Sequence, residues 1–152
     1  MERLANTIAS VGTVCSAPLR GYNPMPAAPI NIIDFHGTID DIIPMSPDSP
    51  GNLGAGPDMT TETTDGYYYH IKQDHLDSVM ASMNCDLSTS SSYPTAMDGV
   101  DGWACQIWSG CDQGKEVVHC NASYGHDYPF YGQRIEGLKI LWDFMKSHAK
   151  TK

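Results

Sequence analysis

The sequence has few basic residues and no long apolar segment. Nine Lys and Arg face 18 Asp and Glu, which gives a formal net charge of −9 at pH 7. Nucleic acids and anionic lipid surfaces both bind basic faces, so the sequence predicts no nucleic-acid or membrane partner. No stretch reaches the roughly 20 apolar residues that a membrane span requires. With 152 residues, 41% of them hydrophobic, the chain suffices for one domain with a core.

The N-terminus also lacks a secretory signal. Residues 1–6 (MERLAN) contain no apolar core of the kind that a signal peptide needs. The cysteines indicate an exported protein nevertheless, because four of the five lie between residues 85 and 120, a density typical of disulfides and an oxidising compartment. We therefore expect an extracellular protein whose export signal is not part of this sequence.

The hydrophobic pattern predicts an α/β fold. Apolar, β-branched runs indicate buried strands, helical spacing indicates helices, and residues 43–65 are rich in Pro and Gly and indicate a loop. The expected strands cover residues 8–15, 30–35, 103–108 and 115–120, and the expected helices cover residues 67–84 and 133–148. We expect about three parallel strands plus a short hairpin strand, with flanking helices. Three parallel strands leave an exposed sheet edge, which suggests part of a larger domain.

Two polar segments follow expected parallel strands. Residues 36–44 (HGTIDDIIP) place Asp40 and Asp41 just past a buried strand, where open α/β sheets carry functional groups. Either carboxylate would also serve as a cap for the next helical turn. His126 lies in a Gly- and Pro-bounded loop after the strand at residues 115–120. Adjacent parallel strands end side by side, so an acid and His126 can form a charge-stabilised base, in the chain order of α/β-hydrolases.

HGTIDDIIP and residues 124–129 (YGHDYP) together resemble the C-terminal half of the polyhydroxybutyrate depolymerase/feruloyl esterase group of α/β-hydrolases. That family has an HGTxDxxVP segment with the triad acid and a GHxWP segment with the triad histidine. The resemblance implies that Asp40 is the acid and His126 the base, with Asp41 as the fallback acid. Tyr128 stands where the family has tryptophan. Residues 1–152 would then be a partial hydrolase domain that lacks the N-terminal half.

The family's nucleophile, a serine in a GxSxG elbow, has no counterpart in this sequence. The nearest strings surround Ser10 and Ser123, and both lack the first glycine. Residues 1–5 (MERLA) resemble the start of the helix that follows the elbow. We therefore expect the chain to begin just after the missing serine and to be inactive on esters as it stands.

The resemblance also implies a disulfide between Cys85 and Cys111. That leaves Cys105 with Cys120, which the expected hairpin would place opposite one another. A zinc site that combines cysteines with His119 and His126 is disfavoured, because the cysteine spacings are not those of structural zinc sites. Cys15, inside an expected strand, is interpreted as a free buried thiol. We expect no metal and no cofactor.

The function that the resemblance implies is carboxylic ester hydrolysis by Ser-His-Asp acyl transfer. The ester substrates would be feruloyl or acetyl esters of plant cell-wall polysaccharide, or a polyhydroxyalkanoate polyester. Two alternatives stay open: a non-catalytic, esterase-derived carbohydrate-binding or interaction module, and an incomplete product with no independent function. An intact pair of Asp40 and His126 argues mildly against the binding module, which has no need of both.

Overall fold

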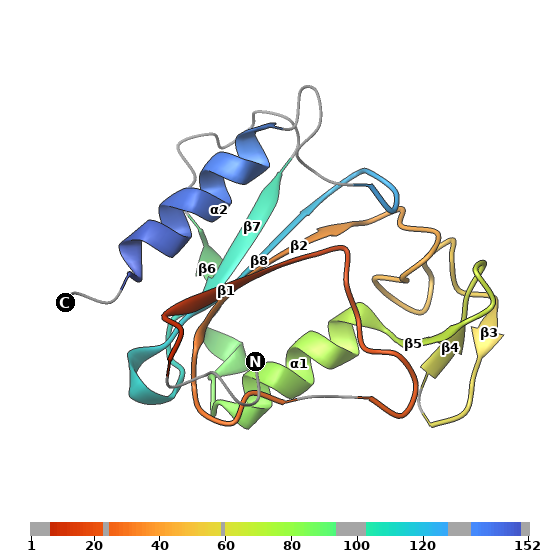
Figure 1. Ribbon diagram of the computed structural model, residues 1–152, viewed down its shortest axis with the longest axis horizontal. Helices are drawn as coiled ribbons and strands as arrows, with labels where there is room; N and C mark the ends of the chain where they lie inside the picture. The colour runs from red at the N-terminus through yellow and green to blue at the C-terminus, as the bar shows by residue number, and fades with distance from the viewer. Residues whose placement is uncertain (1–6, 23–24, 59, 94–102, 128–134, 150–152) are drawn as a thin grey trace.

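The computed structural model describes residues 7–22, 25–58, 60–93, 103–127 and 135–149 (Figure 1). The main sheet has five strands in the order β1-β2-β8-β7-β6, and a smaller sheet has the order β3-β4-β5. The main-sheet strands are β1 (Ser10–Val14), β2 (Asn31–Gly37), β6 (Ser91–Ser92), β7 (Ala104–Trp108) and β8 (Val117–Ala122). The smaller sheet contains β3 (Gly54–Ala55), β4 (Thr60–Glu62) and β5 (Tyr68–His70). The helices are α1 (Lys72–Ser82) and α2 (Ile135–Ser147), with short 3-10 turns at Leu87–Thr89 and Asp112–Gly114.

The prediction of an α/β-hydrolase portion with flanking helices is wrong for the described residues. The main sheet is mixed: β1, β2 and β8 run parallel, β7 pairs antiparallel with β8, and β6 pairs antiparallel with β7. An additional antiparallel sheet occupies residues 54–70, where a loop and the start of a helix were expected. Only two α-helices occur in the described part of the chain. The structure there is mostly sheet.

The physical reason for the difference lies in residues 67–70. Aromatic residues have a high strand propensity, and β5 pairs with the threonines of β4 in place of beginning the helix. The helix therefore starts at Lys72 and covers 11 residues, not the whole of 67–84. The expected hairpin is correct in outline, because β7 and β8 pair antiparallel from Ala104↔Asn121 to Trp108↔Val117.

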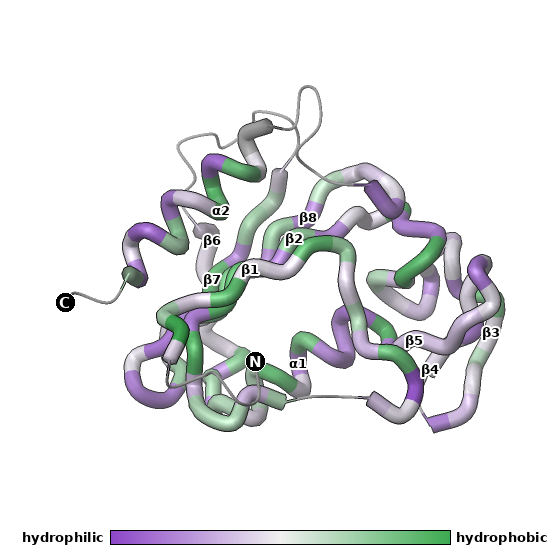
Figure 2. Tube along the Cα trace, viewed as in Figure 1, coloured by the Kyte–Doolittle hydropathy of each residue, from purple (hydrophilic) through white to green (hydrophobic). Residues whose placement is uncertain are grey.

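Strand β2 is buried along its whole length, since α1 covers one face of the sheet and α2 the other (Figure 1). Alternate side chains of a strand point to opposite faces, and the core is accordingly divided in two. Ile33 and Phe35 pack in one cluster with Phe144 of α2, whereas Ile32 packs in the other with Leu76 of α1. Figure 2 shows the apolar residues gathered in the central strands, with polar and apolar residues alternating along α2. Within the described part, no helix is long and apolar enough to cross a membrane.

Both disulfides join segments of this core. Cys85 is bonded to Cys111, and Cys105 is bonded to Cys120, which are the two pairs that the sequence analysis names. Cys105 and Cys120 are direct neighbours across β7 and β8. The bridge therefore ties down the strand that leads to His126. Because four cysteines are oxidised, none of them is available as a zinc-binding thiolate.

Candidate acid–base site

The carboxyl ends of the three parallel strands bring the candidate residues to one edge of the sheet. Strand β1 leads to Cys15, β2 to Asp40 and β8 to His126, and β2 lies between the other two. Beyond its last residue, the β2 chain keeps hydrogen-bonding to the β8 chain. Thr38 N donates to Ala122 O at 2.9 Å, and Ile39 N donates to Tyr124 O at 3.2 Å. The turn after β2 thus lies directly against the loop that carries His126.

Gly37 makes this close approach possible. A Cβ atom at residue 37 would lie 2.1 Å from Tyr124 O and 2.8 Å from Gly125 O, well inside contact distance. Because both neighbours are backbone atoms, no side-chain rotation could relieve the clash. Glycine is therefore required at residue 37 for close backbone packing as well as for the turn.

Asp40 is fully buried and uses its two carboxylate oxygens differently. Oδ1 accepts hydrogen bonds from the backbone N–H groups of Ile42 at 2.9 Å and Ile43 at 2.8 Å. Oδ2 lies 3.0 Å from His126 Nδ1. The capping interpretation of Asp40 and the acid interpretation are thus compatible, because capping holds one oxygen while the other meets the imidazole. Asp41 is exposed, and within the described residues it is Asp40 that hydrogen-bonds to His126.

His126 is partly exposed and lines a small cavity. Its side chain is 38% exposed, whereas that of Asp40 is 0% exposed. With Nδ1 donating to the carboxylate, Nε2 carries the lone pair. A cavity of about 210 Å³ is lined by Val14, Cys15, His126 and Asp127. This arrangement can accept a proton from a hydroxyl group placed in the cavity, and the buried carboxylate would stabilise the resulting imidazolium.

His36 is a neighbour of this pair that the sequence analysis did not single out. It is fully buried, its Nε2 donates to Ile43 O at 2.9 Å, and the same nitrogen lies 3.5 Å from Asp40 Oδ2. Burial lowers the pKa of His36, which keeps the ring neutral beside the carboxylate. The residue closes the turn between β2 and Ile43. The sequence did contain a signal for this role, because His36 begins the HGT segment at the end of a buried strand.

Cys15 lines the same cavity but does not act as the nucleophile that would complete a catalytic triad with Asp40 and His126. It is a free, buried thiol at φ +40°, and it donates to Asp127 O at 3.4 Å. Burial raises the pKa of the Cys15 thiol, which favours the unreactive protonated form. No hydroxyl or thiol of the described residues hydrogen-bonds to His126. Ser10 opens β1 and Ser123 is exposed beside β8.

A second buried polar cluster was missed by the sequence analysis altogether. Asp34 of β2 contacts Lys72 Nζ at 2.6 Å and His119 Nδ1 at 2.9 Å. The signal was available, because Asp34 lies between Ile33 and Phe35 in the middle of a buried strand and a buried charge requires a partner. Which cation would reach it could not be read from the sequence, since Lys72 is 38 positions away on a helix.

Two elements of the sequence interpretation lie outside the described residues: Tyr128 in the histidine segment and the helix expected at residues 1–5. No group of three or more His, Cys, Asp or Glu in the described part is arranged to hold a metal ion. When the chain is compared with known proteins, no family model and no curated protein matches it.

Proposed function

We propose that Asp40 and His126 are the acid and the base of a carboxylic ester hydrolase of the Ser-His-Asp type. The observation that carries the proposal is the 3.0 Å hydrogen bond from His126 Nδ1 to the fully buried Asp40, with the imidazole open to a cavity. The serine nucleophile would come from outside the described residues. The substrate class rests on the resemblance of the two segments and comprises feruloyl or acetyl polysaccharide esters, or polyhydroxyalkanoate esters.

In this mechanism, His126 Nε2 takes the proton from the serine hydroxyl as that oxygen attacks the ester carbonyl. The imidazolium then transfers the proton to the departing alcohol, and water hydrolyses the acyl-enzyme by the same steps in reverse order. Asp40 keeps the ring in the tautomer with Nδ1 protonated and stabilises the positive charge. Two backbone N–H groups anchor the carboxylate, so it does not have to reorganise when the charge forms.

The proposed location is extracellular. The two disulfides support it, because such bonds persist in oxidising compartments. The resemblance to depolymerases and feruloyl esterases supports it too, since polymeric substrates have to be met outside the cell.

The test compares two neighbouring carboxylates. The coding sequence upstream of Met1 is read first, and the chain is expressed together with any in-frame segment that contains GxSxG. Hydrolysis of p-nitrophenyl acetate and methyl ferulate is measured for the parent, Asp40→Asn and Asp41→Asn. Asp40→Asn should lower kcat by about 10⁴-fold, because the ring loses its correct tautomer. Asp41→Asn is the matched control and should remain near the parent.

One observation favours a second candidate, a non-catalytic carbohydrate-binding or interaction module. No nucleophile contacts His126 within the described residues. If Asp41→Asn costs more activity than Asp40→Asn, Asp41 is the acid and the assignment of Asp40 is wrong. If no in-frame upstream segment contains a serine elbow, the hydrolase proposal itself fails. Binding of xylan or other wall polysaccharide by the unextended chain would then support the module.

A further inference from the structure

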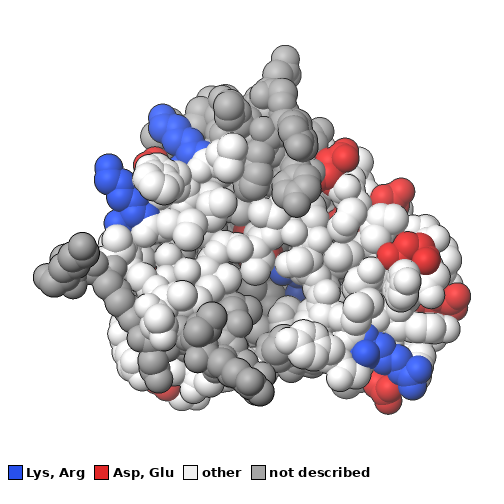
Figure 3. Space-filling view, in the orientation of Figure 1, with Lys and Arg blue, Asp and Glu red and all other residues white. Residues whose placement is uncertain are grey.

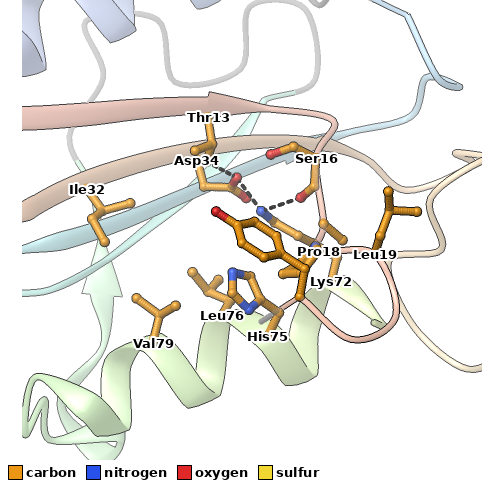
Figure 4. Close-up of a pocket in the computed structure, with 12 residues that line it drawn as sticks. Thr13, Ser16, Pro18, Leu19, Ile32, Asp34, Lys72, His75, Leu76 and Val79 are labelled. Atoms are coloured by element: carbon orange, nitrogen blue, oxygen red, sulfur yellow. Dashed lines mark hydrogen bonds and ion pairs between the residues drawn. The ribbon is translucent and has the colours of Figure 1, made fainter. Parts of the chain in front are cut away.

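A larger cavity lies on the α1 side of the main sheet. It has a volume of about 400 Å³, within the range of small-molecule sites. Thr13, Ile32 and Asp34 line it from the strands, whereas Lys72, His75 and Val79 line it from α1 (Figure 4). Figure 3 shows a hollow in the middle of this face with basic atoms in its depth. The cavity shares no lining residue with the one beside His126.

Most of the wall is apolar. Ala17, Pro18, Leu19, Leu76 and Val79 form much of the lining, and Leu76 and Val79 are themselves core residues. Leu19 is 44% exposed at the chain segment that follows β1. A wall of this kind favours an organic group of about the size of one ring, because its burial would remove apolar surface from water.

The two buried charged groups of the cavity form a closed ion pair, and its other polar lining residues are Thr13, Ser16, Tyr22 and His75. The side chains of Lys72 and Asp34 are 4% and 1% exposed, and their charges cancel. Both oxygens of Asp34 are occupied, Oδ1 by Thr13 and Lys72 and Oδ2 by His119. Burial and the charge of Lys72 lower the pKa of His75 to about 4, so this ring is neutral at physiological pH. No uncompensated charge faces the cavity from these groups.

At the ion pair, one N–H of Lys72 remains for a ligand. The ammonium group of Lys72 has three N–H bonds, and it contacts two acceptors in the described residues, Asp34 Oδ1 and Ser16 O at 2.9 Å. A ligand oxygen can accept the third. An anion or a cation would be desolvated without a free counter-charge, whereas a neutral oxygen would not incur that cost.

We propose that this cavity binds an uncharged, ring-sized molecule that presents a hydroxyl or carbonyl oxygen to Lys72 Nζ. The proposal is independent of the acid–base function, because it uses different residues on a different part of the sheet. Asp34 positions the lysine and Thr13 fixes the carboxylate, while Leu76 and Val79 hold the ring.

Four probes of similar shape and different charge test the proposal: p-cresol, toluene, benzoate and benzylammonium. Binding to the chain is followed by ¹H–¹⁵N NMR titration at pH 7, with shifts read at His75, Leu76 and Val79. p-Cresol should bind most tightly, and both ions should bind at least about tenfold more weakly, because neither finds a free counter-charge. Toluene should be weaker than p-cresol, since it offers no acceptor.

A cavity-filling variant supplies the control. Ala17→Phe should abolish the p-cresol shifts, whereas Ala81→Phe, on the exposed face of α1, should retain them. Three results would each overturn the proposal. One is the absence of shifts at the three α1 residues with every probe, another is equal binding by the two phenylalanine variants, and the third is tighter binding of either ion than of p-cresol.

Discussion

The buried ion pair between Lys72 and Asp34 yields the sharpest prediction from this structure. Lys72→Met keeps the aliphatic stem but leaves the Asp34 carboxylate, 1% exposed, with only His119 and Thr13. Removing one partner of a buried pair costs about 3–5 kcal/mol, because the remaining charge is uncompensated in a medium of low dielectric constant. A domain of this kind has a total stability of about 5–15 kcal/mol, so the loss would be a large fraction of it.

The chain contains a matched control for this experiment. Arg20 and Asp58 form an ion pair at the similar distance of 2.9 Å, but their side chains are 49% and 68% exposed. Water screens such a pair, so Arg20→Met should cost under about 1 kcal/mol. Urea unfolding with the disulfides intact, followed by tryptophan fluorescence, measures both variants. The double variant Lys72→Met/Asp34→Asn should recover part of the stability, which keeps the test informative if the single variant unfolds.

The penalty should also depend on pH in a defined direction. Burial alone would raise the pKa of Asp34, but the charge of Lys72 and the hydrogen bond from His119 hold it well below its ordinary value. In the parent, the stability from this group is present above the unfolded pKa of about 4 and is lost as the pH falls toward the folded pKa. Lys72→Met raises the pKa of Asp34 in the folded protein. The difference in the free energy of unfolding between the parent and Lys72→Met should therefore narrow on acidification. Equal costs for Lys72→Met and Arg20→Met, or a difference that does not change with pH, would refute the reasoning.

Two further predictions concern Gly37 and His75. Gly37→Ala places a Cβ against the Tyr124 carbonyl and should lower the urea midpoint of unfolding strongly. Gly110→Ala is the control, because the nearest atom to its Cβ would be 3.7 Å away, and it should change the midpoint little. Similar midpoints for the two variants would contradict the packing argument. The pKa of His75 is lowered to about 4 by burial, so its contribution to stability is complete above the unfolded pKa of about 6.5 and is lost as the pH falls toward 4. His75→Gln should therefore reduce the loss of stability between pH 7 and pH 4.5, and an unchanged loss would show that other groups cause it.

The sequence predicted the parallel strands, the hairpin and the presence of a C-terminal helix because each depends on local hydrophobic spacing. It did not predict which face of that helix is buried, because Ile140 and Phe144 pack in the core whereas Trp142 is exposed. It predicted the acid–base candidates for a related reason, since adjacent parallel strands end at one edge. Local spacing failed between residues 54 and 70. There, strand propensity and pairing with β4 determined the conformation, and pairing depends on contacts that are not local.

The sequence by itself thus determined which residues could act as acid, base and disulfide partners. Only the tertiary structure decided that Asp40 and not Asp41 meets His126, because the choice depends on the exact path of the turn after Gly37. It alone placed Lys72 on Asp34, which made a second cavity with a closed ion pair. Burial and long-range distance set the chemistry of a charged side chain, and neither is a property of the residues next to it in the chain.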